Sequence, residues 1–402
     1  MDALVLDARL RQSLVAVRSL GRHGLLVAGV ERSAHAPAFR SRWCRVSLVC
    51  PADEGSVEYL DWLETVVDGS PAAVLIPSAD STVDLLRRHR TRIEQRARVA
   101  LAHDPALGIA IDKEQTLAIA QTLGIRVPQT IAIHTVDDVR SAVRAIGLPA
   151  VVKPCESWLQ GSSHGVRVAS EVVTSVEEAH RAVAMLVGLG GGALLQPLLT
   201  GRREAVSLMS VNGLVHARFA QWAKRTAPPL GGESVLRQSI AVPDDIGADA
   251  ERLVSAIELD GYAEVEFRRD AEGRPHLMEI NPRLSASVEI AVRSGVDFPW
   301  LLHQWAAGER VPTIESYRTG GWMRYLGGDI TTTIASLRHR GRPEVTPALT
   351  AVASFFASFL TPMAYDYLDW TDLSPAVAAS TEFLWQTAAS ALKLALATWT
   401  AW

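Results

Sequence analysis

The stretch that decides the fold is residues 261–295, GYAEVEFRRDAEGRPHLMEINPRLSASVEIAVRSG. Its first part alternates between apolar and polar residues, which is typical of a half-buried β-strand. Asp270–Arg274 predicts a turn in which Gly273 is free to take a positive φ. The apolar residues 277–280 predict a returning strand. A helix should follow this β-hairpin and end at Gly295.

Two carboxylates, Glu266 and Glu279, lie inside these apolar strands. If the hairpin register places both on one face, they repel by about 4 kcal/mol at ~4 Å and an intermediate dielectric constant. With the amide oxygen of Asn281 they form an all-oxygen ligand set that suits Mg²⁺. Arg283 then lies where a planar cation can hold a phosphoryl or carboxylate oxygen. An ordinary hairpin with solvated acids and a capping asparagine is the alternative interpretation.

Length and composition favour a large soluble protein. The chain has 402 residues, is 48% hydrophobic and has a net charge of −4, which predicts two or three domains. Without net positive charge, we do not expect a nucleic-acid partner. Cys44, Cys50 and Cys155 have neither metal-site spacing nor an even count, which indicates reduced cysteines and a cytoplasmic location. The N-terminal residues do not resemble a signal peptide.

The first hundred residues alternate short apolar runs with helical periodicity, which predicts a parallel sheet covered by helices. The expected strands are residues 3–6, 25–30, 73–77 and 99–101. No G-x-G-x-x-G follows the first strand, so a dinucleotide fingerprint is absent. Asp80 follows the third strand, where such sheets bind ligands. It either faces a substrate or caps the next helix.

The middle of the chain carries lysines next to a small-residue loop. Asp112 and Gln115 form a capping box, which places Lys113 in the first turn of a helix, where the dipole disfavours a cation. Lys153 ends an apolar strand, and residues 155–165, CESWLQGSSHG, predict a hairpin flap whose N–H groups can hold phosphate oxygens. A surface lysine and a flexible surface hairpin are the alternatives for these two features.

A second group of polar residues follows. Residues 194–198 predict an apolar strand whose backbone can contact a flat base, and Glu204 opens the next strand. Arg218, Lys224 and Arg237 add positive charge near the ends of the expected strands. Such residues usually form a solvated face, but next to a carboxylate pair they favour a polyphosphate with a metal.

The order of these features resembles the ATP-grasp superfamily, and more narrowly its ATP-dependent carboxylate–amine ligases. The resemblance covers roughly residues 1–312 and depends on Lys113, V-V-K-P at Lys153, the flap, L-L-Q-P, Glu204, Glu266 and M-E-I-N-P-R. It implies an α/β (α+β) chain in which an ATP-grasp fold follows a Rossmann-like α/β domain. The implied divisions are an N-terminal α/β domain (1–107), a lid subdomain (108–192), a catalytic subdomain (193–312) and a mostly helical, Trp-rich C-terminal extension (313–402).

The resemblance also implies residue roles. ATP would be held by Lys113 and Lys153 at the phosphates, Ser162, Ser163 and Gly165 of the flap, Gln196 and Leu198 at adenine, and Glu204 at ribose. Mg²⁺, or alternatively Mn²⁺, would be bound by Glu266, Glu279 and Asn281. The implied catalytic cations are Arg283, Arg237 and Lys224. Two departures are visible: Pro197 stands where the family commonly has a glutamate, and the segment 201–204 is one residue longer than usual.

The implied reaction activates a carboxylate as an acyl phosphate and joins it to an amine, with small-molecule substrates and release of ADP and phosphate. A phosphotransferase on the same site and a catalytically inactive nucleotide-binding protein are the alternatives. The C-terminal residues 383–402 predict an amphipathic helix rather than a membrane span. It would pack on the core, form a homodimer seam or contact an apolar substrate.

Overall fold

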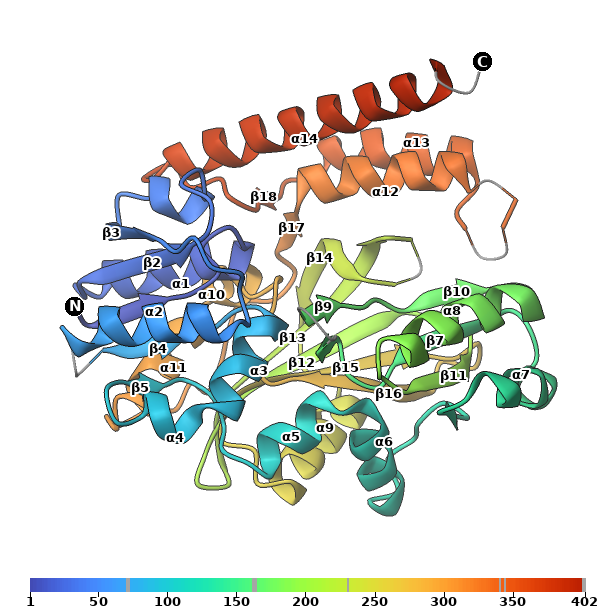
Figure 1. The fold of residues 1–402 in the computed structure, drawn as a ribbon, viewed down its shortest axis with the longest axis horizontal. Helices are drawn as coiled ribbons and strands as arrows, with labels where there is room; N and C mark the ends of the chain where they lie inside the picture. The colour runs from blue at the N-terminus through green and yellow to red at the C-terminus, as the bar shows by residue number, and fades with distance from the viewer. Residues whose placement is uncertain (70–72, 161–164, 230, 340, 343–344, 400–402) are drawn as a thin grey trace.

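The computed structural model describes residues 1–402 except 70–72, 161–164, 230, 340, 343–344 and 400–402, and it omits the side chains of 390–399. The described strands form three larger sheets and one two-stranded hairpin. Helices cover the sheets, and a long C-terminal helix lies along one side of the molecule (Figure 1). The predicted mixed α/β architecture is therefore confirmed.

The N-terminal sheet is parallel and has the order β3-β2-β1-β4-β5. Its strands are β1 (Ala3–Val5), β2 (Val27–Glu31), β3 (Cys44–Val49), β4 (Val74–Ile76) and β5 (Arg98–Val99). Its helices are α1 (Arg11–Arg22), η1 (Pro37–Arg40), α2 (Val57–Asp68), α3 (Asp80–Arg88) and α4 (Arg90–Ile93). The sequence analysis missed β3, whose residues at this sheet edge are mostly exposed and give no apolar run. The strand order reverses between β1 and β4, so their carboxyl ends flank the crevice where such sheets bind ligands.

Two helices, α5 (Ala106–Ile111) and α6 (Lys113–Thr122), lead to a small antiparallel sheet with the order β10-β7-β11-β6. The side chain of Asp112 accepts hydrogen bonds from the backbone N–H of Glu114 and Gln115, which confirms the predicted cap of α6. The small sheet consists of β6 (Ile131–Ile133), β7 (Ala150–Pro154), β10 (Glu171–Val173) and β11 (Ala193–Pro197), with η2 (Val136–Asp138), α7 (Val139–Ile146) and α8 (Val176–Gly188). The flap strands are β8 (Trp158–Gln160) and β9 (Gly165–Arg167).

The largest sheet has the order β16-β15-β12-β13-β14-β17-β18. Its strands are β12 (Arg203–Val211), β13 (Leu214–Ala227), β14 (Glu233–Ile240), β15 (Gly261–Arg269), β16 (Pro275–Asn281), β17 (Trp322–Arg324) and β18 (Ala364–Tyr365). The helices α9 (Asp244–Ala256), α10 (Glu289–Ser294) and α11 (Phe298–Ala306) lie between these strands in the sequence. The predicted hairpin is β15–β16, with Gly273 at φ 80° in its turn and Gly295 at φ 111° after α10. Glu266 lies directly opposite Glu279 in its register.

The C-terminal part adds α12 (Leu326–Arg338), α13 (Ala348–Ala357), η3 (Ser358–Leu360) and α14 (Ser374–Trp399). Figure 1 shows α14 in red, running past α12 and α13. The ring of Phe383 packs beside Gly327 of α12, whereas Trp385 is 76% exposed. Packing on the core therefore accounts for part of this helix. Within the described ranges, no helix is both long and apolar enough to cross a membrane.

Candidate active site

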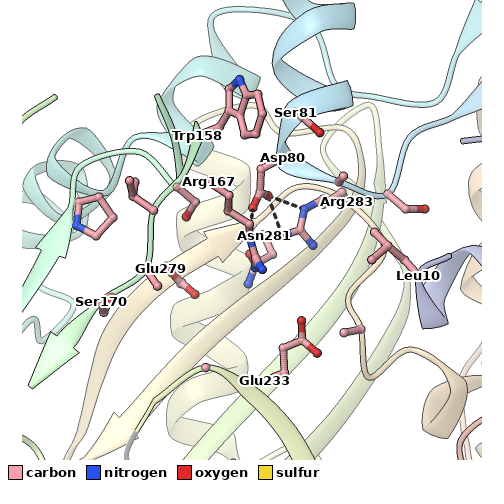
Figure 2. Close-up of a pocket in the computed structure, with 18 of the residues that line it drawn as sticks. Leu10, Asp80, Ser81, Trp158, Arg167, Ser170, Glu233, Glu279, Asn281 and Arg283 are labelled. Carbon is pink, nitrogen blue, oxygen red and sulfur yellow. Dashed lines mark hydrogen bonds and ion pairs between the residues drawn. The ribbon is translucent and has the colours of Figure 1, made fainter. Parts of the chain in front are cut away.

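A large cleft of about 2150 Å³ opens between the three sheets. One wall is the face of the large sheet at β12, β15 and β16, a second comes from β7 and the flap, and the third is the carboxyl edge of the N-terminal sheet. Figure 2 shows side chains from all three walls pointing into the space between them. The cleft is thus built from segments that are far apart in the sequence.

The hairpin places the predicted metal ligands together. In the antiparallel register Glu266 pairs with Glu279 and Glu264 with Asn281. Because side chains alternate along a strand, these four point to the same face, and all four line the cleft. The amide of Asn281 donates a hydrogen bond of 3.2 Å to Oε1 of Glu266. The apolar residues of β15 face the opposite side and join the core.

The carboxylate of Glu266 is held by Arg203, a residue for which the sequence analysis predicted no role. Nε of Arg203 lies 3.0 Å from Oε2 of Glu266, and Nη2 lies 2.6 Å from Oε1. Burial raises the pKa of Glu266 to about 7, even though Arg203 lowers it, and the charge of Glu279 adds to the rise. The charge of Arg203 therefore only partly offsets the cost of burying the Glu266 carboxylate.

The two predicted lysines lie beside this pair of acids. Nζ of Lys113 is 3.4 Å from Oε2 of Glu279 and donates to Oγ of Ser157 at 3.0 Å. Burial opposes the ionisation of Glu279, but the charges of Lys113 and Lys153 outweigh it and hold its pKa below the usual value. Burial lowers the pKa of Lys153 to about 8. A lysine that is poorly solvated but lines a cleft is suited to bind an anion.

Arg283 lies at the junction of the hairpin and the N-terminal sheet. Its Nη2 is 2.6 Å from Oδ1 of Asp80, and Nε of Arg167 from the flap is 3.4 Å from Oδ2 (Figure 2). Burial disfavours the charge of Asp80, yet Arg283 and Arg167 lower its pKa below the usual value. Asp80 makes no helix cap, so of the two interpretations the structure favours the one that faces the cleft. Glu233, paired at 2.8 Å with Arg11, lies across the pocket.

The residues predicted to bind the nucleotide differ in the contacts that they make in the structure. Gln196 and Leu198 line the cleft, but Nε2 of Gln196 donates to Thr130 and the N–H of Leu198 lies 3.4 Å from the carbonyl of Pro149. Gly165 also lines the cleft, and a Cβ there would lie 2.1 Å from the ring of Trp158. Ser162 and Ser163 lie outside the described residues.

The expectation for Glu204 is wrong. Glu204 pairs with Phe267 in the register between β12 and β15, so its side chain points away from the cleft. There it is 3% exposed and forms ion pairs with Arg202 and Arg269, at 3.1 and 2.7 Å. Because side chains alternate along β12, Arg203 takes the position that faces the cleft.

The expectations for Arg237 and Lys224 as catalytic cations are also wrong. Arg237 is fully buried and forms two hydrogen bonds of 2.9 and 2.7 Å to Asp366, which reaches it from the C-terminal extension. Lys224 lies at an irregularity of β13, is exposed, and places Nζ 5.7 Å from the centre of the Trp322 ring. Neither is among the described residues that line the cleft.

The donor set on the large sheet fits a hard divalent cation. Glu266, Glu279 and the amide of Asn281 lie on one face together with Glu264, and burial disfavours the charge of Glu266 there by raising its pKa. No group of three or more histidine, cysteine or acidic residues in the described part of the chain forms a self-sufficient metal site. A bound cation would therefore need further oxygen ligands, which phosphates supply, and Arg203 would have to release Glu266.

Besides Asp80, the N-terminal sheet contributes acids to the cleft for which no role was predicted. Glu31 and Glu54 line it, and the side chain of Asp7 is buried beneath them. Asp7 and Glu31 follow or end apolar runs that were identified as strands, so the rule for carboxyl ends of parallel strands could have found them. Glu54 begins a stretch of helical periodicity, and no local pattern distinguishes it from a solvated acid.

The fold and cleft have counterparts among known proteins. The family model for an ATP-grasp protein in the biosynthetic pathway with the Ter operon matches residues 194–326. A D-alanine–D-alanine ligase of Gloeobacter violaceus is 27% identical over 224 residues, which cover 50% of this chain and 69% of that ligase.

Two solved structures share the fold. Biotin carboxylase from Campylobacter jejuni superposes with a TM-score of 0.64 at 16% identity, covering 80% of this chain and 74% of that one. An L-amino acid ligase from Bacillus licheniformis gives 0.61 at 18% identity, covering 80% of each chain. These structures show that the chain has the ATP-grasp fold, and the sequence matches show that its central part is similar to ATP-grasp carboxylate–amine ligases.

Proposed function

We propose that the protein is an ATP-dependent ligase that joins a carboxylate to an amine. The observation that carries the proposal is the group Lys113, Lys153, Glu266, Glu279 and Arg283, which three separate segments bring into the same cleft. Lysines beside paired acids suit a triphosphate with its metal, and an arginine at the edge suits a carboxylate or the transferring phosphoryl group. The D-alanine–D-alanine ligase and the L-amino acid ligase support the same reaction class.

In the proposed reaction, a carboxylate oxygen of the first substrate attacks the γ-phosphorus of ATP, and the bond to the ADP oxygen breaks. The amine nitrogen then attacks the acyl carbon, phosphate leaves, and the amine loses its proton. Lys113 and Lys153 would hold the phosphates, while Arg283 would orient the transferring group, because such catalysis consists mainly of positioning and charge stabilisation. A divalent cation, proposed as Mg²⁺ with Mn²⁺ as a substitute, would neutralise the developing charge when bound by Glu266, Glu279 and Asn281.

The division at residues 107, 192 and 312 belongs to this proposal, because each part supplies a separate piece of the cleft. A cytoplasmic location is proposed from the three free cysteines. A homodimer through the C-terminal helix stays a prediction.

The test is ADP release from purified protein with panels of acids and amines, followed by mass spectrometry of the product. Release that needs both substrates and gives an amide supports the ligase. A phosphorylated product that forms without the amine would instead identify a phosphotransferase. No ADP from any acid and amine pair would contradict both.

A further inference from the structure

Glu233, the first residue of β14, is an acid of the cleft that the nucleotide chemistry proposed above does not use. Its side chain is 45% exposed. Figure 2 shows it entering the pocket below Asn281 and Arg283. Glu233 therefore faces the part of the cleft where the transferring phosphoryl group and the acyl carbon would lie in the proposed reaction.

The carboxylate of Glu233 is held at one oxygen and open at the other. Nη2 of Arg11 donates a hydrogen bond of 2.8 Å to Oε2, whereas Oε1 accepts none from the described residues. Burial opposes the ionisation of this carboxylate, but the charges of Arg11, Arg167 and Arg283 outweigh it and hold its pKa below the usual value. Glu233 is therefore ionised at neutral pH and has one oxygen that can accept a proton.

Arg11, the partner of Glu233, is itself held by the C-terminal extension. Its Nη1 lies 3.2 Å from Oδ2 of Asp366, and its guanidinium carbon lies 4.3 Å from the centre of the Tyr325 ring. Arg11 is buried and has contacts on several sides, so it holds the carboxylate of Glu233 in one position. A group that takes a proton from a substrate needs such a fixed position, because proton transfer requires hydrogen-bond geometry.

The other acids close to Arg283 are already engaged. Burial lowers the pKa of Arg283, but the charges of three acids outweigh it and raise that pKa: Asp80, Glu279 and Glu233. Asp80 pairs through Oδ1 with Arg283 and through Oδ2 with Arg167. Glu279 belongs to the proposed metal site. Of these three acids, Glu233 is the one with an oxygen available to a substrate.

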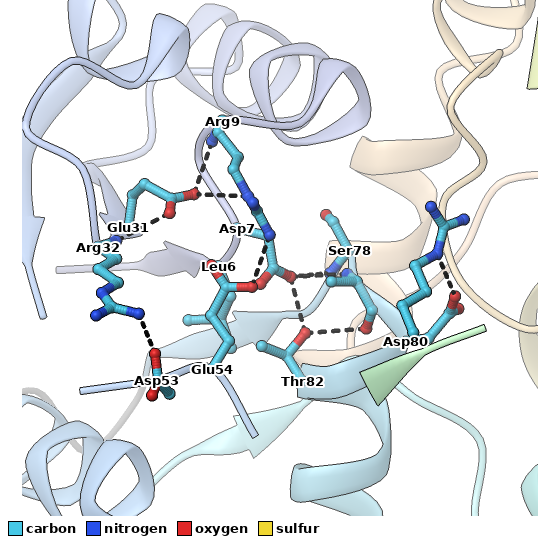
Figure 3. Close-up of polar contacts among 12 residues, drawn as sticks. Leu6, Asp7, Arg9, Glu31, Arg32, Asp53, Glu54, Ser78, Asp80 and Thr82 are labelled. Atoms are coloured by element: carbon cyan, nitrogen blue, oxygen red, sulfur yellow. Dashed lines mark hydrogen bonds and ion pairs between the residues drawn. The ribbon is translucent and has the colours of Figure 1, made fainter. Parts of the chain in front are cut away.

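The acids of the N-terminal sheet belong to a different part of the cleft. Figure 3 shows Glu31 and Glu54 gathered around Arg9, with which they form ion pairs of 3.7 and 2.9 Å. Neither is among the acids that act most strongly on the charge of Arg283. These acids therefore do not compete with Glu233 for a role at the reacting group.

We propose that Glu233 accepts the proton that the attacking amine loses. The lone pair of the neutral amine nitrogen forms the bond to the acyl carbon, and the electron pair of the carbonyl double bond moves to its oxygen. The nitrogen is then positively charged, and its proton passes to Oε1 of Glu233. The carbonyl forms again as the bond to phosphate breaks, and phosphate leaves with the electron pair. Glu233 then releases the proton to water, which reaches its half-exposed side chain.

A carboxylate with a low pKa is a strong enough base for this step. The nitrogen of the adduct is far more acidic than an ordinary ammonium group, because it is positively charged and bonded to an electron-poor carbon. An adduct that keeps this proton expels the amine again, so transfer of the proton commits the adduct to the amide. The inference rests on the proposed ligase function and assigns a catalytic residue to its second step.

The experiment separates the two steps by the choice of nucleophile. The full chain receives ATP, Mg²⁺, the acid found in the ADP screen, and either the amine found there or hydroxylamine, which converts acyl phosphates to hydroxamates. In Glu233→Gln we expect amide formation to fall about 10²-fold, the lower end of what a general base contributes. Hydroxamate formation should fall by less than about threefold, because hydroxylamine is so weakly basic that water can take the proton from its adduct.

The matched control is Glu382→Gln, which removes a half-buried acid of α14 from the lining of the same cleft and should keep both rates. Glu233→Ala is the second test, because added formate should restore its amide formation at least about tenfold if a carboxylate is needed as a base.

Three outcomes would overturn the role of Glu233 and leave the ligase function standing. They are wild-type amide formation in Glu233→Gln, an equal loss with both nucleophiles, and no rescue of Glu233→Ala by formate. If the wild-type protein forms neither amide nor hydroxamate, the ligase function itself is contradicted, and the role of Glu233 with it.

Discussion

The large sheet buries charged residues toward both of its edges, and the two groups differ in what the charges contact. At β15 and β16, Glu266 and Glu279 face a cleft, and their partners Lys113 and Arg203 come from other segments. At β14, β17 and β18, Asp329 and Asp366 of the C-terminal extension are enclosed by the arginines of the sheet. Burial of a charged side chain therefore does not by itself indicate a functional site. A buried charge that faces a cleft and is incompletely compensated by neighbouring charges does indicate one.

The edge at β14, β17 and β18 is called the enclosed edge. Removal of a charge there should lower the free energy of unfolding the most. Asp366 receives Arg237 at 2.7 Å and Arg11 at 3.2 Å, and all three side chains are at most 6% exposed. Asp366→Ala leaves two buried guanidinium groups without this carboxylate, so we expect the free energy of unfolding to fall by about 3–5 kcal/mol. Urea denaturation followed by circular dichroism measures the change.

The control for this prediction is Asp249→Ala, which breaks the exposed pair with Arg252 on α9. It should change the free energy of unfolding by less than about 1 kcal/mol. A loss below about 1 kcal/mol in Asp366→Ala as well would mean that the enclosed edge is not held together by its ion pairs, and the comparison between the edges would fail.

At the edge formed by β15 and β16, which faces the cleft, a substitution should change activity rather than stability. Glu279→Gln keeps the shape of the side chain but removes one carboxylate from the phosphate-binding wall, and we expect ADP formation to fall by roughly 10²–10³-fold. The melting temperature should change little, because the residue is partly solvated. Coupled ADP assays and thermal melts measure both. Glu272→Gln, in the exposed turn of the same hairpin, is the control, and wild-type turnover in Glu279→Gln would remove the proposed metal site.

Local patterns predicted the hairpin edge well. The alternation along residues 261–269 and the turn at Gly273 fix which side chains share a face, so the sequence alone predicts that Glu266, Glu279 and Asn281 lie together. The alternating strands and helices of the N-terminal sheet were predicted for the same reason, although β3 at its exposed edge was not.

Other parts of the site could not be predicted because they depend on register and on distant contacts. The register of β12 decides that Arg203 faces the cleft and Glu204 does not, and a single sequence does not fix that register. Arg237 was expected in the site because its partner, Asp366, is 129 residues away in the sequence. Asp7, Glu31 and Glu54 likewise come near one another only because three separate segments of the N-terminal sheet meet (Figure 3).

Substitution of Arg203 tests whether its guanidinium competes with a metal cation for Glu266. At present its guanidinium supplies the charge that Glu266 needs, with Nη2 2.6 Å from Oε1. Arg203→Gln removes this internal cation, so Mn²⁺ should bind the nucleotide-free protein roughly 10- to 100-fold more tightly, the effect of one charge a few ångströms away. Electron paramagnetic resonance of free Mn²⁺ measures the affinity directly.

Arg202→Gln is the matched control, because Arg202 pairs with Glu204 on the other face and stacks on Trp222. It should leave the affinity for Mn²⁺ unchanged. Unchanged or weaker binding of Mn²⁺ in Arg203→Gln would show that the guanidinium does not compete with a cation, and that Glu266 is enclosed like the acids of the other edge.

The smallest expected effect concerns Lys153, whose pKa burial lowers to about 8. Phosphate binding favours the charged form, so ADP should bind with full affinity below pH 8 and progressively more weakly above it. Between pH 7 and pH 9 the charged fraction falls from about nine-tenths to about one-tenth, which predicts about a fivefold to tenfold rise in the Kd for ADP. In Lys153→Arg the guanidinium stays charged over this range, so the dependence on pH should disappear. A rise of the same size in the Kd for ADP of that variant would assign the titration to another group. That group would not be Glu266, because ionisation of an acid that binds the metal strengthens nucleotide binding as pH rises. Isothermal titration calorimetry across this pH range distinguishes the two outcomes.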